Sequence, residues 1–179
     1  MARIEGVERG GLLVRLAYRV AQRRYGQVLE PMTLWAHSPR LLLSQAGFES
    51  GVERWKALDP VLRDLAVLRA AQVIGCSWCL DFGTYLARKG GADEQQLHAL
   101  AGWRESDLFT PVQRLALEYA EAASVTPVAV TDELVAGLAG HLTPAALVEL
   151  AMVVAVENQR SRFNGGMGLT TQGFCAVPA

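Results

Sequence analysis

The residues most clearly able to carry out chemistry in this chain are two cysteines, in the stretch Cys76-Ser-Trp-Cys79. Residues three apart on a helix share a face, so the two sulfurs can form a disulfide after a modest adjustment. Gly75 precedes the pair and predicts that Cys76 lies at the N-terminus of a helix, where free N–H groups and the helix dipole favour a thiolate. On helix position alone, Cys76 is therefore expected to be the more acidic thiol.

Other interpretations of the cysteine pair are packing in the core, half of a zinc site, or a pair without function. A structural zinc site needs four ligands, and the remaining candidates show no second paired spacing: His37, His98, His141 and Cys175. The pattern therefore favours redox chemistry by the thiols themselves. We expect neither a metal nor another cofactor.

The helices that must position this pair are marked by an oxygen-bearing side chain followed by proline. This combination caps a helix N-terminus and occurs at Asp59-Pro60, Thr110-Pro111 and Thr143-Pro144. Apolar spacing and glycine stops then predict long helices over residues 60–74, from about 76 to 89, from about 111 to 123, and from 143 to about 163. Short helices are expected after Asp93 and Thr131.

The N-terminal third predicts two further helices, separated by Pro31 and Pro39. The first of them, near residues 12–24, is amphipathic and basic, for which a solvated face is a simpler interpretation than a membrane surface or an acidic partner. No alternating apolar pattern with hairpin turns indicates strands. The sequence therefore predicts an all-α fold with a single domain over residues 1–179.

Composition excludes several classes of function. Seventeen basic and 18 acidic side chains give a net charge of −1, which provides no field for a general nucleic-acid binder. The N-terminus carries charges where an export signal needs apolar residues, and the longest apolar run, Leu150 to Val156, is too short to span a bilayer. We therefore expect a cytoplasmic protein with no membrane and no nucleic acid as partners.

Two segments resemble a known family. Residues 62–83, LRDLAVLRAAQVIGCSWCLDFG, followed by ARKGG at 87–91, look like the core of the carboxymuconolactone decarboxylase and alkylhydroperoxidase D-like family. Residues 147–164 resemble the long helix that closes the domain in those proteins. The resemblance covers roughly residues 40–170, which leaves an N-terminal helical extension and a short C-terminal tail. It implies an alkylhydroperoxidase D-like helical bundle that assembles into trimers or hexamers.

A C-x-x-C in this setting resembles the peroxidase-like branch of the family, and that resemblance implies roles for both cysteines. Cys79 attacks the hydroperoxide, and Cys76 resolves the resulting sulfenic acid as a disulfide. This assignment is opposite to the one that helix position suggests. A thiol or dithiol reductant must then reopen the disulfide.

The residues that activate the thiol depart from the family pattern. Those enzymes use a glutamate one helix earlier, a histidine inside the C-x-x-C and a histidine four residues after the second cysteine; here the positions hold Asp64, Trp78 and Gly83. Asp64 remains able to accept a proton. Trp78 and Gly83 are not, so we expect Trp78 to shape the substrate pocket and Gly83 to leave room for substrate or another side chain. His98 and His141 are possible substitutes in space.

Two more residues near the pair have open roles. Asp81 follows Cys79 by two residues and lies on a different helix face, so a role in the site and a solvated or ion-paired carboxylate are equally open. Arg69 and Arg88 are equally ambiguous. Cys175 is the odd thiol, in a tail over residues 173–179 that we expect to be mobile unless it docks on a neighbouring subunit.

The sequence thus predicts an enzyme, a thiol-dependent alkylhydroperoxide reductase of the peroxiredoxin type that cycles a Cys76–Cys79 disulfide. One alternative on the same fold is decarboxylation of a small lactone acid, for which the chain lacks a histidine at the family position. The other is a non-enzymatic protein whose assembly responds to the disulfide.

Overall fold

The computed structural model describes residues 2–175, and within this range the chain is entirely helical apart from its connections. The elements are α1 Leu12–Tyr25, α2 Glu30–Trp35, α3 Pro39–Val52, α4 Pro60–Ile74, α5 Ser77–Lys89, α6 Glu94–Ala99, the 3-10 helix η1 Leu100–Glu105, α7 Pro111–Ser124, α8 Asp132–Ala139 and α9 Pro144–Met167. The prediction of an all-α fold is confirmed.

The three proline-marked helix starts are capped as the sequence predicts. Asp59 Oδ1 accepts a hydrogen bond from the Leu62 N–H at 2.9 Å, and Thr143 Oγ1 accepts one from the Ala146 N–H at 3.2 Å. Thr110 opens α7 with a reciprocal capping box, in which the Gln113 side chain also accepts from the Thr110 N–H at 2.9 Å. Each cap satisfies backbone donors that a helix start leaves free.

The N-terminal third differs from the prediction, because it holds three helices rather than two. Pro31 does not separate helices; it lies in the first turn of the short helix α2, where proline costs no hydrogen bond. At the other end of the chain, α9 is about one turn longer than expected. It ends at Gly168, whose φ of 73° provides the left-handed cap.

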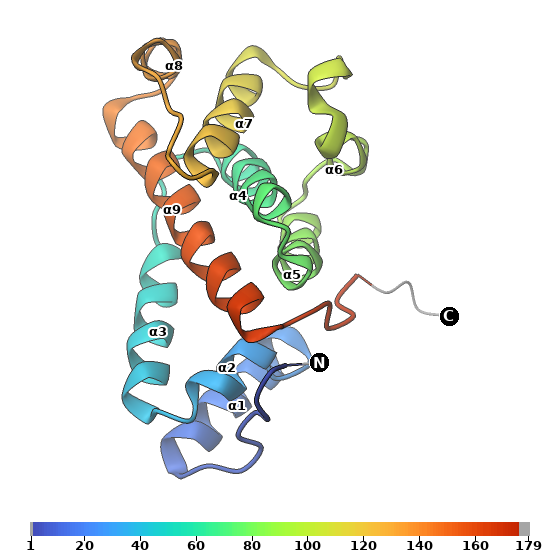
Figure 1. The fold of residues 1–179 in the computed structure, drawn as a ribbon, viewed down its shortest axis with the longest axis vertical. Coiled ribbons are helices and arrows are strands. Elements are labelled where there is room, and N and C mark those ends of the chain that lie inside the picture. Colours follow the sequence, from blue (N-terminus) through green and yellow to red (C-terminus); the bar gives the residue numbers. More distant parts are fainter. Residues whose placement is uncertain (1, 176–179) are drawn as a thin grey trace.

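Helix α4 lies at the centre of the bundle and packs against α5, α7 and α9 (Figure 1). Small side chains on α4, such as Ala66 and Ala70, let these helices approach closely, and Leu150 and Val153 of α9 complete the contact. The N-terminal helices α1, α2 and α3 gather at one end of the elongated molecule, beside the last turns of α9 (Figure 1). Helix α8 lies at the opposite end.

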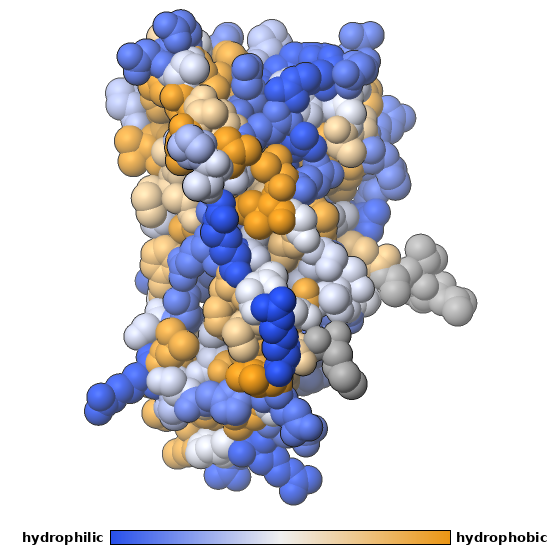
Figure 2. Space-filling model, viewed as in Figure 1, coloured by the Kyte–Doolittle hydropathy of each residue, from blue (hydrophilic) through white to orange (hydrophobic). Residues whose placement is uncertain are grey.

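Apolar side chains reach the surface in patches among hydrophilic residues (Figure 2). On α1, Leu12, Leu16 and Val20 are all more than half exposed. Among the described residues, no helix is both long enough and apolar enough to cross a bilayer.

Candidate active site

The turn between α4 and α5 places the cysteine pair. Gly75 ends α4 in the left-handed conformation, with a φ of 81° that side chains rarely adopt, and its N–H donates to the Ala71 carbonyl at 2.9 Å. The next residue, Cys76, is the N-cap of α5, and its Sγ accepts a hydrogen bond from the Cys79 N–H at 3.2 Å. The prediction that Cys76 lies at a helix N-terminus is therefore confirmed.

Cys76 and Cys79 form a disulfide, with their Cα atoms 5.3 Å apart. The two residues are only 3% and 6% exposed, and they pack with Leu34, Ala71 and Leu169 in one apolar cluster. The bond joins two residues that are three apart, within the first turn of α5. The pair can therefore alternate between dithiol and disulfide at the start of α5.

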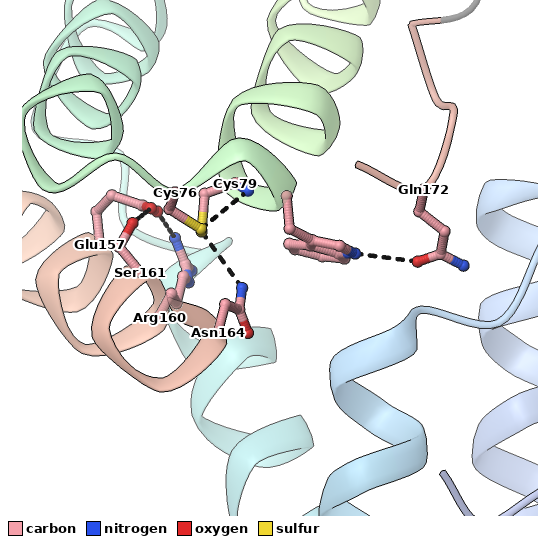
Figure 3. The surroundings of a disulfide bond; sticks show 8 residues. Cys76, Cys79, Glu157, Arg160, Ser161, Asn164 and Gln172 are labelled. Carbon is pink, nitrogen blue, oxygen red and sulfur yellow. Dashed lines mark hydrogen bonds and ion pairs between the residues drawn. A yellow bond between two sulfur atoms is a disulfide. The ribbon is translucent and has the colours of Figure 1, made fainter. Parts of the chain in front are cut away.

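A row of polar side chains on α9 faces this disulfide (Figure 3). Glu157, Ser161 and Asn164 follow one another at helical spacing, and each is 3% exposed or less. The Asn164 Nδ2 donates to the Cys79 Sγ at 3.3 Å, and the Ser161 hydroxyl donates to Glu157 Oε1 at 2.6 Å. The row places a carboxyl group, a hydroxyl group and an amide on the side of α9 that carries the cysteine contact.

Burial raises the pKa of the Glu157 carboxyl to about 7, because the charged form loses its hydration. Arg160, whose Nη1 lies 3.5 Å from Glu157 Oε2, and the Ser161 hydroxyl act in the opposite direction but do not cancel this effect. Arg160 is itself held by Glu49 of α3, to which its Nε donates at 2.9 Å. A carboxyl group with a pKa near neutrality is suited to accept and return a proton.

Asp64, the proton acceptor suggested by sequence, lies at the other end of the α4–α5 pair. Its Oδ2 is 3.4 Å from the position that a Cβ on Gly90 would take, just beyond the last turn of α5. Burial raises the pKa of Asp64, although the guanidinium of Arg63 at 3.2 Å acts against this. Helix α5 is about 20 Å long at 1.5 Å per residue, so the structure does not bring Asp64 to the cysteines.

The structure places Trp78 beneath the C-terminal segment rather than in an open pocket. Its indole N–H donates to Gln172 Oε1 at 3.1 Å, and its ring centroid lies 5.1 Å from that of Phe82 and 6.4 Å from that of Phe174. The space left at Gly83 is taken up by Leu68, whose Cδ2 would lie 2.9 Å from an added Cβ. A neighbouring side chain, not a relay group, therefore occupies this position.

Asp81 anchors the C-terminal segment through its carboxylate, whose hydrogen bonds in the described residues all go to that segment. Its Oδ2 accepts hydrogen bonds from the backbone N–H groups of residues 172, 173 and 174 at 2.8–3.1 Å, and its Oδ1 accepts one from Cys175 at 2.8 Å. Burial acts to raise the pKa of Asp81, but these four donors outweigh it and hold the pKa below its usual value.

The expectation for the tail is corrected as far as the structure describes it. Residues 173–175 dock on Asp81 of the same chain, so no neighbouring subunit is needed; residues 176–179 lie outside the described range. The Cys175 thiol also donates to the Asp81 carbonyl at 3.1 Å, and burial raises its pKa. This thiol lines an open cavity of about 450 Å³ with Ser77, Thr84 and Arg88.

The remaining sequence candidates lie at the surface or in ion pairs. His98 and His141 are exposed. Arg69 pairs with Glu121 at 2.6 Å, and Arg88 pairs with Glu94 at 2.6 Å. Within residues 2–175, no three His, Cys, Asp or Glu side chains come together in a way that could hold a metal ion.

Sequence reasoning missed the polar row on α9, although its residues stand in the stretch that resembles the closing helix of the family. Their spacing of four and three residues was a visible signal of a shared face. What the sequence did not show is that this face is buried against the cysteines.

Comparison with known proteins gives the class of this chain. The model of the carboxymuconolactone decarboxylase family matches residues 41–122. The uncharacterized protein YnjA of Escherichia coli strain K12 is 39% identical over 168 residues, which cover 93% of this chain and 92% of that protein. The chain belongs to the carboxymuconolactone decarboxylase family.

Solved structures show the same fold. A cysteine-to-alanine variant of the debrominase Bmp8, in complex with 2,3,4-tribromopyrrole, matches with a TM-score of 0.86 at 17% identity and covers 97% of this chain and 95% of its own. An uncharacterized peroxidase-related protein from Ralstonia eutropha JMP134, described as an alkylhydroperoxidase AhpD core, matches with a TM-score of 0.81 at 17% identity and covers 99% and 100%. The predicted alkylhydroperoxidase D-like bundle is confirmed.

Proposed function

We propose that this protein is a thiol-dependent oxidoreductase that reduces hydroperoxides and cycles the Cys76–Cys79 disulfide. The observation that carries the proposal is a buried cysteine pair at the start of α5, packed against the polar row of α9. Membership in a family with peroxidase-related structural relatives supports it. The family resemblance assigns the attack to Cys79 and the resolving step to Cys76.

The reaction balances with the groups of the site and one hydroperoxide. The Cys79 thiolate attacks the O–H oxygen of the hydroperoxide, the O–O bond breaks, and the alcohol leaves after taking up a proton. Cys76 then attacks the sulfur of the Cys79 sulfenic acid, the S–O bond breaks, and water leaves. Cys76 is well placed for this step, because the N-cap position favours its thiolate.

Glu157 takes the role that the sequence suggested for Asp64. In its ionised form it accepts the proton of the Cys79 thiol, and in its protonated form it returns that proton to the alkoxide that leaves the peroxide. A pKa of about 7 leaves both forms populated near neutral pH.

The proposed cycle needs a thiol or dithiol reductant that reopens the disulfide. The disulfide is buried, so it must become accessible at the start of α5 during turnover.

Assembly into a homo-oligomer stays a prediction. The exposed side chains of Leu12, Leu16 and Val20 on α1 provide an apolar surface for it. Sedimentation of the purified protein measures the number of subunits.

The test is a thiol count and an intact mass before and after one equivalent of cumene hydroperoxide. We expect the reduced protein to lose two thiols per chain, and peptide mapping to find a Cys76–Cys79 link. Cys79→Ser should abolish the reaction with peroxide. Cys175→Ser is the matched control and should react as the unmodified chain does.

Several outcomes contradict the proposal. Thiols that stay reduced in folded protein would mean that the pair is structural. Turnover of a carboxymuconolactone that survives the loss of both cysteines would favour the decarboxylase alternative. A change of assembly on oxidation, without turnover, would favour a redox-responsive oligomer.

A second candidate function uses the two electrons of the Cys76–Cys79 dithiol to reduce a different substrate. The debrominase Bmp8 shares the fold over nearly its whole length, and aromatic rings of Trp78, Phe82 and Phe174 lie beside the cysteine pair here. Reductive debromination of 2,3,4-tribromopyrrole would replace one C–Br bond by C–H, release bromide and a proton, and oxidise the dithiol to the disulfide. Bromide release that depends on Cys79 distinguishes this reaction from peroxide reduction.

A further inference from the structure

An amide oxygen buried beside the cysteine pair has no partner. Asn164 is 2% exposed, and its Oδ1 finds no hydrogen-bond partner among residues 2–175. Buried side-chain oxygens in folded proteins are nearly always paired, because an unpaired one gives up its hydration without compensation. This oxygen lies on the same amide group whose Nδ2 donates to the Cys79 Sγ. The unpaired atom is therefore at the redox centre itself.

The oxidised state of the pair explains why one amide atom is satisfied and the other is not. A disulfide sulfur carries no hydrogen, so it can only accept, and the amide N–H must face it. The oxygen is then left without a partner, although the sulfur that its amide contacts belongs to a buried apolar cluster. An apolar side chain of similar size would fill this place without an unpaired atom. The presence of an amide here is better explained if a hydrogen-bond donor for Oδ1 appears in another state of the catalytic cycle.

The reaction proposed above supplies such a donor. After the Cys79 thiolate has attacked the hydroperoxide and the O–O bond has broken, the sulfur carries an O–H group. That hydroxyl is attached to the sulfur that the Asn164 amide already contacts in the disulfide state (Figure 3). It can donate its hydrogen to Oδ1, which is unpaired in the disulfide state.

We propose that Asn164 is a catalytic residue of the Cys79 half-reaction. Its N–H stabilises the Cys79 thiolate before the attack. Its Oδ1 then accepts the O–H of the hydroperoxide and afterwards that of the Cys79 sulfenic acid, until Cys76 displaces the hydroxyl as water. The assignment rests on the proposed function, and it adds the residue that holds the substrate oxygen through the step.

The experiment uses the full chain with serine at Cys76 and Cys175, so that Cys79 is the only thiol. The parent is compared with Asn164→Leu, which removes both polar atoms at similar volume, and with Asn164→Asp, which keeps an acceptor and removes the donor. Asn158→Leu is the matched control, because Asn158 lies on the same helix and donates to Ser124 Oγ at 2.9 Å. Circular dichroism establishes that each variant is folded.

The first readout is the thiol pKa of Cys79, from the ultraviolet absorbance of the thiolate as a function of pH. We expect Asn164→Leu and Asn164→Asp each to raise this pKa by about one unit, which corresponds to about tenfold less thiolate below the pKa. Asn158→Leu should leave it unchanged. Equal pKa values in the parent and both Asn164 variants would overturn the role of the amide.

The second readout is the sulfenic acid that cumene hydroperoxide forms on Cys79, trapped with dimedone and measured by mass. We expect the trapped fraction to fall about tenfold in Asn164→Leu, and an unchanged fraction would overturn the acceptor role of Oδ1. If the parent itself forms no sulfenic acid, the proposed function fails. The pKa readout then still decides whether Asn164 stabilises the thiolate.

Discussion

Replacement of Glu157 by glutamine should change how the stability of the protein depends on pH. Burial raises the pKa of this carboxyl from 4.5 to about 7, and the repulsion from Glu49 adds to that effect, whereas Arg160 and Ser161 oppose it. The folded chain therefore binds this proton more tightly than the unfolded chain does. The free energy of unfolding contributed by Glu157 is fully present below about pH 4.5 and is lost as the pH rises through about 7.

The size of the effect follows from the shift. A change of about 2.5 pKa units corresponds to about 3 kcal/mol of unfolding free energy, at 1.36 kcal/mol per unit. Glutamine has a similar size and retains an oxygen for the Ser161 hydroxyl, but it does not ionise. The stability of Glu157→Gln relative to the unmodified protein should therefore increase by about 3 kcal/mol between about pH 4 and about pH 8.

Urea titrations of the oxidised protein, at one fixed protein concentration across this pH range, measure that difference. Titrating groups that do not interact with Glu157 cancel in the subtraction. Glu118→Gln makes the same exchange at an exposed position of α7, so it is the matched control and should not reproduce the increase of about 3 kcal/mol. A constant difference for Glu157→Gln as well would refute the conclusion that burial holds this carboxyl near neutrality.

Two further predictions concern residues that surround the pair. Asp81→Asn leaves one acceptor oxygen for four backbone N–H donors and removes the negative charge of the carboxylate that binds them. Cys175 should therefore be alkylated by iodoacetamide at least about tenfold faster, and an unchanged rate would contradict the anchoring role of Asp81. Gly83→Ala should lower the free energy of unfolding by about 1 kcal/mol in urea titrations, because its Cβ would lie 2.9 Å from Leu68 Cδ2, and stabilisation would contradict this packing.

Each of these variants has a control within the chain. Asp107→Asn changes an exposed carboxylate in the loop before α7 and should leave the alkylation rate of Cys175 unaltered. Gly47→Ala places a Cβ in open space on α3, so it should stabilise the protein by up to about 1 kcal/mol through helix propensity alone.

The helices that carry the site could be predicted because their signals are local. Asp59, Thr110 and Thr143 cap helices through contacts only three residues away, and Gly75 ends α4 through its own backbone conformation. Helix α2 was missed because it has only six residues, too few for a periodic pattern, so that its proline was interpreted as a break.

The sequence by itself determined the two helices around the site and the position of the cysteine pair. It shows a capped helix, a glycine that ends it, and two cysteines one turn apart at the start of the next helix. It also suggested Asp64 as the proton acceptor, by position in the chain. Only the tertiary structure decided that Asp64 lies at the far end of α5, that the Asn164 amide contacts Cys79, and that Glu157 is buried on the same face of α9. Caps and turns depend on neighbours within a few residues, whereas the burial of one face of α9 depends on how α3, α4 and α5 pack around it.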